Sequence, residues 1–157
     1  MSNKIILDPC SGSRMFWFDK NHNEVIFGDN RELETALCDG RLLRVSPDML
    51  MDVTNLPFDE GVFKLVVFDP PHLVYAGDKS WLAQKYGVLP KDWSMFLAEA
   101  FTECMRVLEP YGVLVCKWNT EQISFKEFIR AIGFTPLFGD RRGKTRWMVF
   151  MKLQSMN

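Results

Sequence analysis

The sequence predicts a single α/β domain with a mostly parallel, seven-stranded sheet that closes in a C-terminal antiparallel hairpin. Short apolar runs of strand length alternate with longer amphipathic runs along the 157 residues. Four of the apolar runs are followed directly by an aspartate, either alone or as a Gly-Asp pair. The last two apolar runs follow each other with no helical run between them, which is typical of a hairpin.

The first half of the chain supplies four of the expected strands. The clearest is the run VFKLVVF at residues 62–68, which is apolar enough for a strand buried on both faces. The other three are expected at residues 4–7, 24–27 and 49–51. We expect short helices at residues 13–18 and 31–37, and a small hairpin within residues 38–45.

The second half begins with residues 73–92, which are polar and lack a sustained period, so a long functional loop is expected there. A helix is expected at 93–108, ended by Pro110-Tyr111-Gly112. The remaining elements are a strand at 113–118, a helix at 125–132 stopped by Gly133, and strands at 134–138 and 146–152 joined by the basic loop 139–144.

Length and composition fit one domain spanning residues 1–157, with no separate target-recognition domain. The sequence has no apolar run near 20 residues and no signal-peptide layout, so we interpret the protein as cytoplasmic and without membrane contact. Its four cysteines form no C-x-x-C pair and no zinc spacing with histidine, so no metal site is expected. A net charge of −1 argues against a strong non-specific nucleic-acid binder but leaves room for a local basic patch.

The four aspartates at the strand ends indicate a ligand site, because an open parallel sheet binds its ligand beyond the carboxyl ends of its strands. The first follows a strand and opens the turn Asp8-Pro9-Cys10-Ser11-Gly12, where Gly12 lets the backbone approach a ligand. The alternative is an ordinary turn between a strand and a helix, which would have the same sequence features. Asp29 lies about twenty residues further on, which is the spacing of an acid that accepts hydrogen bonds from ribose hydroxyls.

The third aspartate, Asp52, is followed by apolar residues that include Leu56. Its carboxylate suits the amino group of an adenine, with an apolar neighbour against the ring. The alternative for Asp29 and Asp52 alike is a solvated loop carboxylate.

The most specific segment is Asp69-Pro70-Pro71-His72, at the end of the 62–68 strand. The two prolines stiffen the backbone and remove two N–H donors. The Asp69 carboxylate and the Pro70 carbonyl then remain as acceptors that suit an exocyclic amino group, and His72 offers a flat ring on which a base can stack. The alternative is a turn that only ends the strand.

These motifs resemble the class I S-adenosylmethionine (SAM) dependent methyltransferases, and within them the amino-methyltransferases of DNA and RNA with a D-P-P-Y type motif. The opening also resembles small phage- and prophage-type methyltransferase-like proteins that begin with D-P-C-x-G-S-R-M-F-W-F. The resemblance implies a Rossmann-like fold, SAM as cofactor, S-adenosylhomocysteine as product, and methyl transfer to an exocyclic amino nitrogen. The foremost acceptor is adenine N6 in DNA or RNA.

The resemblance also implies roles for individual residues. Residues Asp8, Pro9, Cys10 and Gly12 would line the methionine end of SAM, Asp29 would bind its ribose, Asp52 and Leu56 its adenine, and Asp69, Pro70, Pro71 and His72 would hold the acceptor. Two positions depart from the pattern: Gly12-Ser13-Arg14 lacks the usual second glycine, and His72 stands where Tyr, Phe or Trp is commoner.

Without a recognition domain, substrate choice would come from the long loop, the basic hairpin or a protein partner. The long loop mixes cations and aromatics, as single-strand binders do. The candidate substrate-binding residues are Lys79, Trp81, Lys117, Arg141 and Arg142, with Lys85 and Tyr86 beside them in the loop. A solvated surface is the alternative for this set.

Two other functions stay open. One keeps SAM and changes the acceptor to cytosine N4, a protein amide or a small molecule. The other is a SAM-binding interaction module without turnover. The sequence leaves the choice between DNA and RNA and the oligomeric state undecided.

Overall fold

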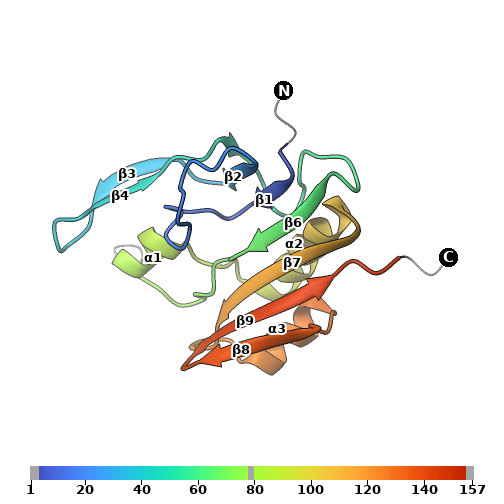
Figure 1. Ribbon diagram of the computed structural model, residues 1–157. Coiled ribbons are helices and arrows are strands. Elements are labelled where there is room, and N and C mark those ends of the chain that lie inside the picture. Colours follow the sequence, from blue (N-terminus) through green and yellow to red (C-terminus); the bar gives the residue numbers. More distant parts are fainter. Residues whose placement is uncertain (1–3, 78–79, 155–157) are drawn as a thin grey trace.

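The computed structural model describes residues 4–77 and 80–154, and its centre is a seven-stranded sheet in the order β5-β2-β1-β6-β7-β9-β8 (Figure 1). A second, two-stranded sheet pairs β3 with β4. The strands are β1 Ile6–Asp8, β2 Val25–Asp29, β3 Leu33–Ala36, β4 Leu42–Val45, β5 Met49–Leu50, β6 Phe63–Phe68, β7 Leu108–Asn119, β8 Phe138–Arg142 and β9 Thr145–Met151. The helices of the described residues are α1 Trp81–Tyr86, α2 Trp93–Val107 and α3 Phe125–Ile132.

Strands β5, β2, β1, β6 and β7 run parallel, so their carboxyl ends lie along one edge of the sheet. Strand β9 lies antiparallel between β7 and β8 and forms the C-terminal hairpin with β8. The chain builds outward from β1 to β2 on one side, and resumes with β6 on the other side of β1. The order therefore reverses between β1 and β6, which is where an open α/β sheet forms its ligand crevice.

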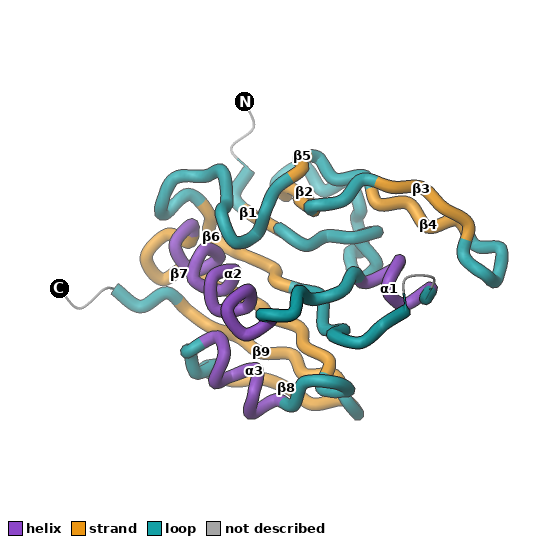
Figure 2. Tube along the Cα trace, turned by 180° about the vertical axis from the view of Figure 1, so that it is seen from behind, coloured by secondary structure: helices purple, strands orange, loops and turns teal. Residues whose placement is uncertain are grey.

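Helices α2 and α3 lie on the same face of the sheet, in front of it in Figure 2. The core is aromatic: the Phe101 ring of α2 packs against Phe68 at 6.1 Å and Phe150 at 4.8 Å between ring centroids. On α3, Phe128 stacks on Trp118 of β7 at 4.3 Å. Each such ring contributes roughly 1.5–3 kcal/mol of stability by leaving water.

The predicted α/β class, the mostly parallel seven-stranded sheet and the antiparallel C-terminal hairpin are confirmed. The helix predicted at 125–132 has the predicted bounds, because Ser124 caps it through a capping box with Glu127 and Gly133 ends it at a φ of 74°. The predicted helix at 93–108 ends one residue early, at Val107.

Two helices predicted in the first half of the chain are wrong. Residues 13–18 form successive turns instead of a helix. Residues 31–37 contain strand β3, which pairs with β4 and forms the hairpin that projects beyond one end of the sheet (Figure 1). Residues Leu33–Ala36 form a strand because they pair with β4. Such a pairing could not be predicted, because a short polar segment shows no periodicity.

Three predictions for the second half also need correction. The long loop 73–92 contains the short helix α1, none of whose residues is buried. Strand β7 begins at Leu108, so the segment at Pro110 lies within an irregular start of the strand, where Tyr111 has a φ of 64°. Strand β8 covers 138–142 where 134–138 was predicted, so most of the expected basic loop is the edge strand, and the turn is at Gly143.

No helix in the described ranges is both long and apolar enough to cross a membrane.

Candidate functional site

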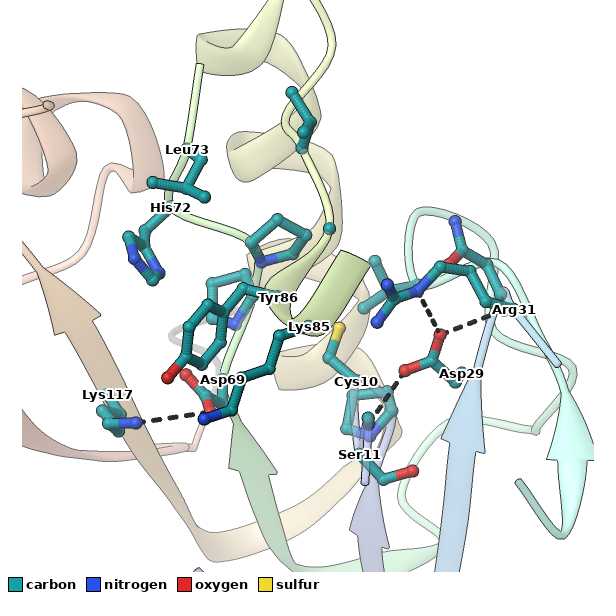
Figure 3. A pocket seen from close by; sticks show the side chains of 18 of the residues that line it. Cys10, Ser11, Asp29, Arg31, Asp69, His72, Leu73, Lys85, Tyr86 and Lys117 are labelled. Carbon is teal, nitrogen blue, oxygen red and sulfur yellow. Dashed lines mark hydrogen bonds and ion pairs between the residues drawn. The ribbon is translucent and has the colours of Figure 1, made fainter. Parts of the chain in front are cut away.

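A cavity of about 530 Å³ opens beyond the carboxyl ends of the parallel strands. The turn after β1, the end of β2 and the segment after β5 form one half of its wall (Figure 3). The end of β6, the end of β7 and helix α1 form the other half. This size lies in the range of pockets for small ligands, about 300–1,000 Å³. The residues that bear on its chemistry are Pro9, Cys10, Ser11, Gly12, Phe16, Asp29, Arg31, Asp52, Asp69, Pro70, Pro71, His72, Lys85, Tyr86 and Lys117.

The turn after β1 is fastened to β2 by two backbone donors. Ser11 N donates to the Gly28 carbonyl at 2.8 Å, and Gly12 N donates to Asp29 Oδ2 at 2.9 Å. Gly12 has a φ of 51°, in the left-handed region that favours glycine. A Cβ at Gly28 would come within 2.4 Å of the Met51 side chain, which would have to move to admit it.

Asp29 is buried, and its carboxylate accepts three hydrogen bonds. Besides Gly12 N, Oδ1 accepts from Arg31 N at 3.0 Å and from Arg31 Nε at 3.3 Å. A carboxylate offers about four lone-pair positions, so one on Oδ2 remains for a ligand donor. Ser11 also lines the cavity, but its Oγ is buried and has no hydrogen-bond partner in the described part of the chain. An unpaired buried hydroxyl costs about 1–3 kcal/mol.

Asp8 does not line the cavity, contrary to the expectation. It is fully buried beneath the turn, where its carboxylate accepts from Trp17 Nε1 at 2.7 Å and from Cys10 N at 3.3 Å. Burial raises the pKa of Asp8 to about 8, although the Trp17 hydrogen bond opposes this rise and the charge of Asp69 adds to it. Asp8 therefore shapes the turn from below.

Of the two residues expected to bind adenine, Asp52 lies in the cavity wall and Leu56 does not. Asp52 lines the cavity and accepts from Thr54 N at 2.9 Å and from Thr54 Oγ1 at 2.7 Å. Leu56 does not line it: its backbone N donates to Glu103 of α2 at 2.8 Å and its side chain is buried in the core. Met51 and Val53 form the apolar wall beside Asp52 instead.

The four residues Asp69-Pro70-Pro71-His72 all line the cavity from the end of β6. Asp69 Oδ2 lies 3.7 Å from Lys117 Nζ on the neighbouring strand β7. Burial raises the pKa of Asp69 to about 6, against the opposing effect of the Lys117 charge. Burial, and secondarily the charge of Lys117, lowers the pKa of His72 and so favours its neutral form.

The His72 ring lies 5.4 Å from the Tyr86 ring of α1 and 6.5 Å from Trp118. The Lys117 ammonium lies 5.6 Å from the ring of Phe16 and 6.0 Å from that of Trp147, which meet edge to face. Aromatic rings therefore flank Lys117, and the Lys85 ammonium of α1 lies 5.2 Å from the Tyr86 ring.

The other candidate substrate residues lie elsewhere. Trp81 is on α1 but outside the cavity wall, and Arg141 and Arg142 are exposed on edge strand β8. Lys79 lies outside the described residues. The sequence reasoning missed Phe16 and Arg31. For Phe16 the signal was present, because it belongs to the M-F-W run of the opening motif; nothing in the sequence marks Arg31.

No protein-family model matches the sequence, and no curated protein matches it significantly. Solved structures do match. One is the complex between the Haloferax volcanii Trm112 methyltransferase activator and its methyltransferase, with a TM-score of 0.55 and 13% identity over 99% of this chain and 84% of that chain. A second is the antibiotic-resistance methyltransferase Kmr, with a TM-score of 0.51 and 14% identity over 97% and 87% of the two chains.

A third is geranyl diphosphate methyltransferase in complex with GPP and sinefungin, with a TM-score of 0.51 and 11% identity over 96% of this chain and 71% of that chain.

The chain has the class I methyltransferase fold. Sequence identities this low establish the fold alone, so the ligand and the acceptor have to be argued from the cavity. Among the residues that the structure describes, no three His, Cys, Asp or Glu side chains are grouped to hold a metal ion.

Proposed function

We propose that this protein is a SAM-dependent N-methyltransferase that acts on an exocyclic amino nitrogen, with adenine N6 in DNA or RNA as the favoured acceptor. The observation that carries the proposal is the placement of Asp29 and Asp69 in the walls of one cavity, at the carboxyl ends of β2 and β6. One half of the cavity fits a nucleoside, and the other half has an acceptor group for an amine.

The cofactor half would be held by residues of the first two strand ends. Asp29 has an acceptor position left for a ribose hydroxyl. Asp52, with Met51 and Val53 behind it, suits the amino edge and the face of an adenine. When bound, SAM supplies an electrophilic methyl group. The methyltransferase names of the neighbouring structures support this assignment through the shared fold.

The acceptor half would be held by the segment after β6. An ionised Asp69 accepts an N–H from the amino group, which turns the nitrogen lone pair out of conjugation and toward the methyl group. Lys117 opposes the effect of burial on the Asp69 pKa and so helps to keep this carboxylate ionised near neutral pH. With SAM bound, the amino nitrogen would displace the sulfur from the methyl group and leave S-adenosylhomocysteine, and the methylated nitrogen, now acidic, would lose its proton to water.

A base as acceptor would use the ring surfaces at the rim, His72 and Tyr86. Because the cavity lies at the edge of a sheet, a base would have to be unpaired or flipped out of a duplex to reach Asp69. The fold does not choose the acceptor, since the named neighbours include a geranyl diphosphate methyltransferase and an antibiotic-resistance methyltransferase. One neighbour is solved with a protein activator, so a protein partner is a further source of target choice in this proposal.

The test is methyl transfer from labelled SAM to separate pools of DNA, RNA, protein and small-molecule metabolites, with the polymers digested to nucleosides or amino acids before mass spectrometry. We expect label on the N6 position of adenine, suppressed by excess unlabelled SAM. Label on cytosine N4, on a protein amide or on a small molecule would keep the methyltransferase and change the acceptor. Tight SAM binding with no transfer to any pool would contradict the proposal and favour a binding module.

A further inference from the structure

Arg31 joins two parts of the cavity wall that are distant in the sequence. Its Nε donates to Asp29 Oδ1 at 3.3 Å (Figure 3). Its Nη1 donates to the Gln84 carbonyl of α1 at 2.9 Å. The guanidinium therefore spans from the carboxylate proposed for the ribose to the helix over the cavity. Its side chain is 25% exposed, against 6% for that of Asp29.

Helix α1 has few other contacts, among them the Tyr86 ring at 5.4 Å from the His72 ring. None of its residues is buried, yet Leu82, Lys85 and Tyr86 line the cavity. Within the described ranges, the bond from Arg31 is the only hydrogen bond that joins residues 80–87 to a part of the chain outside the 73–92 segment.

The residues on either side of α1, at 73–75 and 89, are held by hydrogen bonds that do not involve α1. Leu89 N donates to the Leu73 carbonyl at 2.7 Å, and the Gln122 side chain bonds Val74 and Tyr75. These residues thus keep their position independently, while α1 depends on Arg31 for its hydrogen bond to the part of the chain outside the segment. A segment with few buried contacts and one fastening opens at low free-energy cost.

We propose that Arg31 is a positioning residue that clips α1 onto the cofactor half of the cavity and couples the position of α1 to SAM binding. Arginine is suited to this role because its fork offers separate donors in fixed geometry, which a lysine ammonium lacks. A ligand held between Asp29 and α1 binds the clipped state more tightly, and by linkage the clip strengthens the binding of that ligand. The coupling, but not the clip, rests on the proposed function.

The clip is tested without any ligand, by hydrogen exchange in the free protein. The amides to follow are those of residues 84–87, where Gln84 N and Gly87 N donate within the helical turn. Arg31→Ala should speed their exchange about tenfold or more, the effect of losing a charge-assisted hydrogen bond. Arg44→Ala is the matched control, because Arg44 is an exposed arginine of the β3–β4 hairpin that pairs with Glu34 at 3.8 Å. Exchange within twofold of wild type in Arg31→Ala would overturn the clip.

Arg31→Lys separates charge from geometry. It keeps a cation beside Asp29 but cannot bridge to Gln84, so exchange at 84–87 should stay fast, and slow exchange in this variant would overturn the role of the fork. Calorimetry with SAM then tests the coupling: Arg31→Ala should weaken binding at least about fivefold. Unchanged affinity with a fast-exchanging α1 would overturn the coupling. Absence of SAM binding by the wild type would instead refute the proposed function and leave the exchange result standing.

Discussion

The Asp29 carboxylate and the Gly12 amide meet across the carboxyl ends of β2 and β1, where Gly12 N donates to Asp29 Oδ2 at 2.9 Å. The acid proposed for the ribose thus also fixes the turn that lies against the rest of the cofactor. This double use explains why Asp29 can be almost fully buried and still serve a ligand. It ties the shape of the turn to the same group that would bind the cofactor.

Asp29→Ala should therefore weaken SAM binding by a few kcal/mol, since it removes a charged hydrogen-bond acceptor and the anchor of the turn. The fold should survive, because the sheet does not depend on this side chain. Calorimetry measures the affinity, and Asp59→Ala, at an exposed position away from the cavity, is the control. Unchanged SAM affinity in Asp29→Ala would remove the ribose assignment.

Asp8 predicts an unusual dependence of stability on pH. Its pKa is about 8 in the folded protein, whereas the pKa of an exposed aspartate carboxyl is 3.8. Between these values the folded state holds the proton and the unfolded state does not, so the free energy of unfolding should fall as pH rises from about 4 to about 8. Asp8→Asn keeps an acceptor for Trp17 and should flatten this slope. Denaturant titrations at several pH values test it, and equal slopes in both proteins would contradict the buried, protonated Asp8.

Lys117 should set the acid limb of the activity profile. Asp69 must be ionised to accept an amino N–H, and its pKa is about 6, so turnover should fall below that pH. Lys117→Met removes the charge that lowers this pKa, and the acid limb should move to higher pH. Lys126→Met, on the exposed side of α3, should leave it unchanged. The measurement is the single-turnover rate as a function of pH. An acid limb at the same pH in Lys117→Met as in the wild type would contradict the proposed effect of Lys117 on the Asp69 pKa.

His72→Ala should impair capture of the base more than chemistry. Stacking on an aromatic ring is worth roughly 1–3 kcal/mol per base, and flipping a paired base costs a few kcal/mol. The Michaelis constant should rise, and more for duplex than for single-stranded substrate. His72→Phe should restore capture, because it keeps a flat ring. Steady-state kinetics on both substrates give the answer, and equal effects of Ala and Phe would argue against stacking.

The elements predicted well are those whose signal is local. Strand β6 is an apolar run interrupted only by Lys64, and α3 has a capping box and a terminal glycine, so each is visible in one stretch of sequence. Strand β3 was missed because it depends on pairing with β4, and α1 was missed because a helix with no buried residue has no apolar period.

For the site, acids placed directly after strands predicted that Asp29, Asp52 and Asp69 line one cavity. The same reasoning placed Asp8 there wrongly, because the position after a strand does not say whether the side chain turns outward or down into the core, as it does toward Trp17. Arg31 was not predictable, because its contact with Gln84 exists only once the segment after β6 has folded back over β2.

The central claim is that Asp69 draws the acceptor nitrogen toward the methyl group, and Asp69→Ala tests it most directly when SAM binding and single-turnover methylation are measured side by side. We predict SAM affinity within about twofold of wild type and a methylation rate lower by about a hundredfold or more, since the lost interaction acts mainly in the transition state. Methylation of the amino group by Asp69→Ala at the wild-type rate would contradict the account and leave the Asp-Pro-Pro-His segment as a turn.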